Sequence, residues 1–125
     1  MSAKRKILVV DDVAVSLSIT EQALHDYYEV ITMNSGERAL RYLKEETPEL
    51  ILLDIGMEPI DGIQTLKEIR KMKSCQDIPV IMLTGRDDKL SVCESSKLGI
   101  DSYVLKPFQA DDLLERVKKA LMAKS

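Results

Sequence analysis

The sequence predicts one α/β domain, an open and doubly wound parallel sheet in which five strands alternate with five helices. Three continuous apolar runs carry this prediction, at residues 7–10, 50–53 and 80–83. Such runs lack the in-out alternation of a half-exposed strand and are typical of strands that helices cover on both faces. No linker or repeat interrupts the 125 residues, so we expect a single domain over residues 1–125 with its core at about 6–122.

The remaining elements follow from weaker patterns between these runs. Residues 28–32 and 102–105 are less apolar and are expected to be the outer strands. Four expected helices have mostly apolar residues at helical spacing, which fall on one face of each helix. In chain order, these residues are Val13, Leu17, Thr20 and Leu24; Ala39, Leu40 and Leu43; Ile63, Leu66 and Ile69; and Leu113, Leu114, Val117, Ala120 and Leu121.

The segment 87–98 has a more polar pattern and is expected to be a helix with much of its surface free. Ser35 and Asp61 are expected to be N-caps, because their side-chain oxygens can accept hydrogen bonds from a first helical turn. Gly99 is expected to end the helix before it.

Composition excludes several classes of function. The formal charge of −3 is spread along the chain, which argues against binding of nucleic acid or anionic membrane as the main activity. Cys75 and Cys93 stand apart without metal-ligand spacing, and His25 is the single histidine, so neither a disulfide framework nor a zinc site is expected. No apolar run reaches membrane-spanning length and no signal peptide is recognised, so we expect a cytoplasmic protein.

Polar residues stand where each of four expected strands ends. They are Asp11 and Asp12 after the first strand, Asp54 after the third, Thr84 after the fourth, and Lys106 with Pro107 after the fifth. Ligands of doubly wound sheets bind outside the carboxyl ends of the strands. Three carboxylates gathered there repel one another unless a cation or proton offsets them. Because only oxygen ligands are offered, Mg²⁺ is the expected ion.

Lys106 and Thr84 are then expected to meet an anion at this site. The ammonium of Lys106 can neutralise phosphoryl charge, and the hydroxyl of Thr84 can donate a hydrogen bond to a phosphoryl oxygen. An ion pair between Lys106 and one aspartate is the simpler alternative, but it leaves Thr84 and the small Gly85 unexplained. Together the residues indicate phosphoryl transfer with a carboxylate as the acceptor.

These motifs resemble the receiver domain of two-component response regulators. The resemblance covers residue 6 to about residue 122 and rests on Asp11-Asp12, Asp54, Thr84-Gly85 and Lys106-Pro107-Phe108, in order and at typical separations. It implies the flavodoxin-like strand order 2-1-3-4-5. It also implies a phospho-accepting signalling domain of a phosphorelay, which catalyses its own phosphorylation and dephosphorylation and is not otherwise an enzyme.

The resemblance implies a role for each motif residue. Asp54 accepts the phosphoryl group from a phosphohistidine, Mg²⁺ is held by Asp12, Asp54 and the carbonyl of Gly56, and Asp11 acts through a metal-bound water. Thr84 and Lys106 contact the phosphoryl group, Thr84 and Tyr103 form the switch, and the Lys106–Pro107 peptide bond is cis. The implied partners are a sensor histidine kinase or phosphotransfer protein, and a downstream target or effector domain. That output partner binds the face formed by residues 87–98, 102–105 and 109–122, and phosphorylation-dependent dimerisation is a further expectation.

The sequence departs from the family pattern in the loop after Asp54. Met57-Glu58-Pro59 places the proline one position late, and Gly56 and Arg86 stand two positions beyond Asp54 and Thr84, where phosphoryl lifetime is influenced. Three alternatives stay open: a haloacid-dehalogenase-type phosphatase, a flavodoxin-like electron carrier, and a degenerate receiver that only binds proteins. The sequence lacks the Asp-x-Asp motif of such phosphatases after its first strand. Acids also occupy the loop in which an electron carrier would bind a flavin phosphate.

Overall fold

A computed structural model describes residues 4–55, 62–85, 97, 99–100 and 102–124. Its strands form one parallel sheet in the order β2-β1-β3-β4-β5, which confirms the doubly wound sheet and its implied strand order. The two least apolar strands are its margins, as expected. The strands are β1 (Lys6–Val10), β2 (Glu29–Met33), β3 (Leu50–Asp54), β4 (Val80–Thr84) and β5 (Ser102–Leu105).

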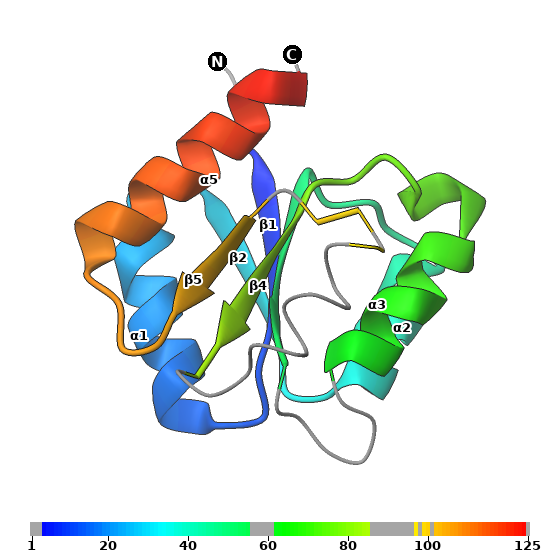
Figure 1. Cartoon of the computed structure of the whole chain (residues 1–125), viewed down its shortest axis with the longest axis horizontal. Coiled ribbons are helices and arrows are strands. Elements are labelled where there is room, and N and C mark those ends of the chain that lie inside the picture. The colour runs from blue at the N-terminus through cyan, green and yellow to red at the C-terminus, as the bar shows by residue number, and fades with distance from the viewer. Residues whose placement is uncertain (1–3, 56–61, 86–96, 98, 101, 125) are drawn as a thin grey trace.

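Helices cover both faces of the sheet (Figure 1). On one face lie α1 (Ala14–Leu24) and α5 (Ala110–Lys124), and on the other lie α2 (Gly36–Leu43) and α3 (Gly62–Lys71). A short 3₁₀ helix, η1 (Lys73–Cys75), follows α3 and was not expected. The expected helix at 87–98 lies almost wholly outside the described residues. No helix in the described part of the chain is long and apolar enough to cross a membrane.

The sheet separates two apolar layers. Ile7 and Val9 of β1 pack with the layer under α1 and α5, whereas Leu8 and Val10 pack with the layer under α2 and α3. All four side chains are completely buried. Successive side chains of a strand point to opposite faces, so a strand covered on both sides is apolar at every position.

Since every strand runs in the same direction, their carboxyl ends gather at one end of the sheet. We call this the carboxyl end, and in Figure 1 the arrowheads of β4 and β5 point toward it. The opposite end, where the strands begin, is the amino end. Helices start at the carboxyl end and return to the amino end, so the two ends differ in the backbone groups that they present.

The expected helix signals have mixed outcomes. Ser35 is the N-cap of α2, since its side chain accepts a hydrogen bond from Arg38 N at 3.1 Å, whereas Asp61 lies outside the described residues. Gly99 has a φ of +80°, the left-handed conformation typical of a helix end. The assignment of Val13 to the buried face of the first helix was wrong, because its side chain is 51% exposed. Val13 is the extended N-cap residue of α1, so helical spacing does not apply to it.

Candidate functional site

The structure brings most of the predicted site residues to the carboxyl end. Asp11 and Asp12 directly follow β1, and Lys106 directly follows β5. Asp54 and Thr84 are the last residues of β3 and β4 rather than the first residues beyond them, because backbone pairing continues through Asp54↔Leu83 and Thr84↔Leu105. The strands therefore reach one residue closer to the site than the sequence indicated.

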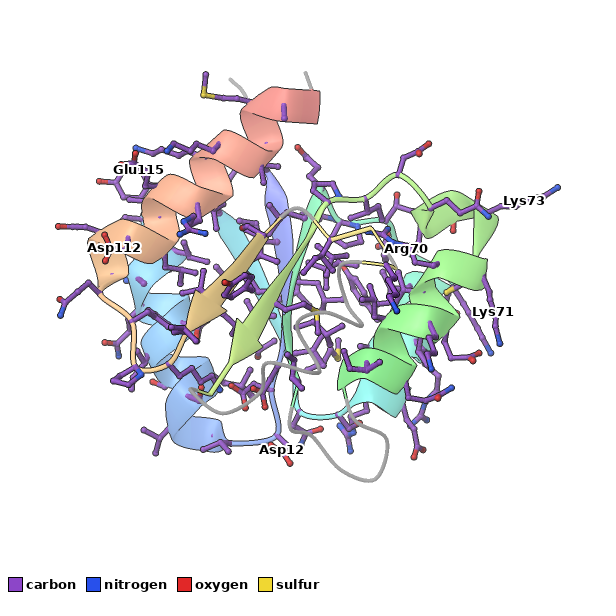
Figure 2. The ribbon with its side chains drawn as sticks, in the orientation of Figure 1. Asp12, Arg70, Lys71, Lys73, Asp112 and Glu115 are labelled. Carbon is purple, nitrogen blue, oxygen red and sulfur yellow. The ribbon has the colours of Figure 1, made fainter. Side chains whose placement is uncertain are left out.

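Three carboxylates meet at this end of the sheet. Asp11, Asp12 and Asp54 each offer an oxygen, and these atoms all lie within 4.8 Å of one another. Asp11 is completely buried and Asp54 is 8% exposed. Asp12 is exposed, and Figure 2 shows it on the loop below the strand tips. The cluster thus has two buried members and one that faces solvent.

Lys106 joins two of these carboxylates. Its Nζ lies 2.7 Å from Oδ2 of Asp11 and 3.2 Å from Oδ1 of Asp54. The lysine side chain is 25% exposed, so its ammonium is only partly hydrated. Two buried carboxylates therefore share a single cation, and the described site retains net negative charge.

The surroundings of Asp54 disfavour its ionised form. Burial raises the pKa of the Asp54 carboxyl above its ordinary value of 3.8, the ammonium of Lys106 opposes this, and the negative charges of Asp11 and Asp12 add to the rise. Burial alone would lower the pKa of Lys106, but its hydrogen bond to Asp11 and the charge of Asp54 outweigh that effect and raise it. The lysine is therefore held as a cation. Any further positive charge nearby would favour the ionised form of Asp54.

Ser16 belongs to this site, although no sequence motif indicated it. The Ser16 hydroxyl donates to Oδ2 of Asp11 at 2.5 Å, and the backbone N–H of Val13 donates to Oδ1 at 3.0 Å. A serine in the third position of a predicted helix has no sequence signal of its own. Only the turn from β1 into α1 makes it a neighbour of the carboxylate.

Gly62 is a second residue that sequence reasoning missed. Its N–H donates to the carbonyl of Ile55 at 2.8 Å, and a Cβ added to it would stand 2.1 Å from the carbonyl oxygen of Asp54. Only a residue without a side chain allows α3 to begin this close to the backbone of Asp54. The signal in the sequence is the glycine that directly follows Asp61, the residue expected to be the N-cap.

The structure describes only some of the other predicted site residues. Tyr103 lies on β5 with 44% of its surface exposed, and the Lys106–Pro107 peptide bond is cis. The side chain of Thr84 lies outside the described part of the structure. The same holds for Gly56, residues 57–59 and Arg86.

The arrangement suits a hard divalent cation beside the Asp54 carboxylate. Carboxylate oxygens are the ligands that Mg²⁺ prefers, and it keeps coordination positions for water and for a phosphate. The donor set of Asp11, Asp12 and Asp54 fits this ion, since the cluster offers only oxygen and carries excess negative charge. Lys106 stands where it can contact an anion bound next to Asp54.

The sequence matches a known family along most of its length. Residues 7–118 match the response regulator receiver domain. The alkaline phosphatase synthesis transcriptional regulatory protein PhoP of Bacillus subtilis (strain 168) is 37% identical over 118 residues, which make up 94% of this chain and 48% of that protein. The chain thus spans about half the length of the curated relatives it matches.

Solved structures share the fold. The chemotaxis protein CheY4 of Vibrio cholerae superposes with a TM-score of 0.89 and 27% identity, covering 94% of this chain and 99% of that one. The receiver domain of a sensor histidine kinase from Pseudomonas aeruginosa PAO1 has a TM-score of 0.88 and 26% identity, covering 95% of this chain and 98% of that one. That second structure holds a magnesium ion in its active-site cleft.

Proposed function

The chain belongs to the family of response regulator receiver domains, which accept a phosphoryl group in two-component signalling, and we propose that its acceptor is Asp54. The observation that carries this proposal is the meeting of Asp54, Asp11 and Lys106 at the carboxyl end. Family membership also removes the phosphatase and the electron carrier as alternatives. A degenerate receiver is left to the experiment below.

The proposed reaction moves one phosphoryl group between two side chains. A carboxylate oxygen of Asp54 attacks the phosphorus of a phosphohistidine, the P–N bond breaks, and the released imidazole nitrogen takes a proton. Because burial raises the pKa of Asp54, the carboxyl is a better nucleophile than a fully hydrated one once it is ionised. We propose that the domain itself promotes this transfer and the later hydrolysis.

We propose Mg²⁺ as the cofactor, held directly by Asp12, Asp54 and the carbonyl of Gly56, with Asp11 acting through a water. The excess negative charge of the three described carboxylates supports this assignment. When bound, the ion supplies positive charge that offsets the carboxylates and the incoming phosphoryl oxygens. The magnesium in the Pseudomonas aeruginosa receiver domain is a further support.

We propose that Lys106 and Thr84 contact the phosphoryl group and that Tyr103 reports its presence. Lys106 already lies 3.2 Å from Asp54, so a small movement brings its ammonium to a phosphoryl oxygen. Tyr103 is 44% exposed here, and in the proposed switch it turns inward when Thr84 moves toward the phosphoryl group. Such a turn changes the surface formed by β5 and α5.

The proposed partners follow from the same family. The phosphoryl donor is a sensor histidine kinase or a histidine phosphotransfer protein. Residues 1–125 form a single receiver domain, which acts in the cytoplasm. The output passes through the face of residues 87–98, β5 and α5 to a target protein or effector domain, or to a second copy in a phosphorylation-dependent dimer. PhoP of Bacillus subtilis, a transcriptional regulatory protein, has about twice the length of the matched segment, which supports an attached effector.

The proposal is tested by labelling with a small phosphodonor. The wild type and Asp54→Asn are incubated with Mg²⁺ and acetyl phosphate, and the intact mass of each is measured. We expect the mass gain of one phosphoryl group in the wild type alone, and beryllofluoride should change the spectrum of the wild type alone. Asp26→Asn, which removes an exposed carboxylate near the amino end, is the matched control and should be labelled as the wild type is.

Two results would contradict the proposal. Equal labelling of Asp54→Asn and the wild type would place the acceptor elsewhere. A wild type that folds and binds Mg²⁺ but takes no label from acetyl phosphate or from a phosphorylated kinase would be a degenerate receiver.

A further inference from the structure

Ser16 touches the site from a helix that carries none of the motif residues, and we infer that it is a positioning residue for Asp11. This inference rests on the proposed function and extends it to how the carboxylates of the proposed magnesium site are held in position. The Ser16 side chain contacts neither Asp54 nor Lys106 in any described hydrogen bond, so its effect on phosphoryl transfer must pass through Asp11.

The Asp11 carboxylate is fixed by donors on both of its oxygens. The N–H of Val13 donates to Oδ1, while the Ser16 hydroxyl and the Lys106 ammonium both donate to Oδ2. A buried carboxylate with donors on both oxygens cannot rotate without breaking at least one hydrogen bond. Of the three donors, the serine hydroxyl is the one that a substitution removes without altering the backbone or the charge of the site.

The Ser16 hydroxyl, in the first turn of α1, bonds to a group outside its own helix. Serine and threonine side chains inside helices can bond to the carbonyl four residues earlier. Thr20 on the same helix does so, donating to the carbonyl of Ser16 at 3.0 Å. The Ser16 hydroxyl instead reaches a carboxylate five positions back in the chain and outside α1.

The hydroxyl also limits how strongly Asp11 holds Lys106. The ammonium lies 2.7 Å from Asp11 but 3.2 Å from Asp54, so the two carboxylates compete for it. Because Ser16 shares Oδ2 with the ammonium, part of the charge of Asp11 is satisfied by a neutral donor. Without the hydroxyl, Oδ2 of Asp11 keeps the ammonium as its one described donor, so we expect Asp11 to bind Lys106 more tightly and to draw it away from Asp54. That shift would change the positions of Asp11 and Lys106 in the proposed magnesium site and the phosphoryl site.

The test compares Mg²⁺ binding by Ser16→Ala, Ser16→Thr and the wild type, using calorimetric titration of the full chain. Removing a residue that orients a metal ligand typically weakens metal binding by about 10–100-fold, so we expect the Mg²⁺ dissociation constant of Ser16→Ala to rise about tenfold. Ser16→Thr keeps a hydroxyl and should stay within about threefold of the wild type. Ser18→Ala, an exposed serine on the same helix, is the matched control and should bind as the wild type does.

The outcomes separate this inference from the proposed function. A Ser16→Ala protein that melts at a lower temperature but keeps the wild-type Mg²⁺ affinity would show a merely structural hydroxyl and overturn the inference. Ser16→Thr binding as weakly as Ser16→Ala would also overturn it. In both cases the wild type is still labelled at Asp54, so the proposed function stands. A wild type that binds no Mg²⁺ overturns both.

Discussion

The two ends of the sheet bind charged side chains of opposite sign. At the carboxyl end, carboxylates are bound by backbone N–H groups and a lysine, as Asp11 is by Val13 and Lys106. At the amino end, cations are bound by backbone carbonyls. Lys4 donates to the carbonyl of His25 after α1, and Arg70 donates to four carbonyls before β4 and β5.

This difference follows from the winding of the chain. Helices begin at the carboxyl end with unpaired N–H groups and finish at the amino end with unpaired carbonyls. Anions are therefore favoured at the first end and cations at the second. The charges at the carboxyl end are not balanced, because three carboxylates there face one described lysine. At the amino end, the described cations Lys4 and Arg70 have carbonyl acceptors. At the carboxyl end, the three described carboxylates leave excess negative charge, which an added cation would offset.

The largest expected effect contrasts two glycines. Gly62→Ala should lower the free energy of unfolding by about 3 kcal/mol, because the new Cβ would stand 2.1 Å from the carbonyl oxygen of Asp54 and the backbone must shift. Gly99→Ala near the amino end meets nothing within 4 Å and should cost only about 1 kcal/mol, the strain of its positive φ. Urea unfolding measures both. Equal losses would mean that packing against Asp54 does not set the start of α3.

The next contrast is between the two cations that join separate segments. Lys106→Met should destabilise the metal-free protein by about 2 kcal/mol, because it leaves the buried carboxylate of Asp11 with only neutral donors. Saturating Mg²⁺ should recover much of this loss, since a bound cation replaces the missing charge. Thermal melting with Mg²⁺ and with EDTA measures the recovery.

Arg70→Met is the matched control at the amino end. Figure 2 shows Arg70 on α3, and its nearest described acceptor is the carbonyl of Gly99 at 2.8 Å. Its loss should cost about 1–2 kcal/mol, and Mg²⁺ should change that cost no more than it changes the wild type. Recovery of Arg70→Met by Mg²⁺ to the same degree as Lys106→Met would show that the ion acts on the whole fold rather than on the carboxyl end.

A smaller effect of opposite sign is expected at Asp54. Its pKa is raised in the fold, so the unfolded chain ionises at lower pH and the folded protein loses stability as pH rises from about 3.8 through the folded-state pKa. Asp54→Asn escapes this loss. In EDTA, the variant should therefore be more stable than the wild type at neutral pH, with the advantage vanishing in acid.

Urea midpoints of the two proteins, taken between about pH 4 and pH 8, test this prediction. Saturating Mg²⁺ should reverse the order, because the ion should stabilise the protein with all three carboxylates more than the variant with two. A wild type that is more stable than Asp54→Asn in EDTA at neutral pH would mean that Lys106 compensates Asp54 fully.

The sequence predicted the site wherever chain order alone determines position. Asp11 and Lys106 are far apart in the chain, yet parallel strands must bring their positions to one end of the sheet, and the 2.7 Å contact is the result. Ser16 and Gly62 could not be found in this way, because their roles depend on how closely α1 and α3 begin to the strands. Val13 was misassigned for the same reason, as helical spacing does not say where a helix starts.

The smallest effect is expected where the amino end carries an exposed ion pair. Arg5 Nε lies 3.4 Å from Glu49 Oε2, and both side chains are about half exposed, at 48% and 50%. A double-mutant cycle of Arg5→Ala and Glu49→Ala should give a coupling below about 0.5 kcal/mol, because solvent screens such a pair. The coupling should also fall with added salt and should not respond to Mg²⁺. A coupling as large as the loss in Lys106→Met would contradict the view that burial, rather than ion pairing itself, separates the two ends.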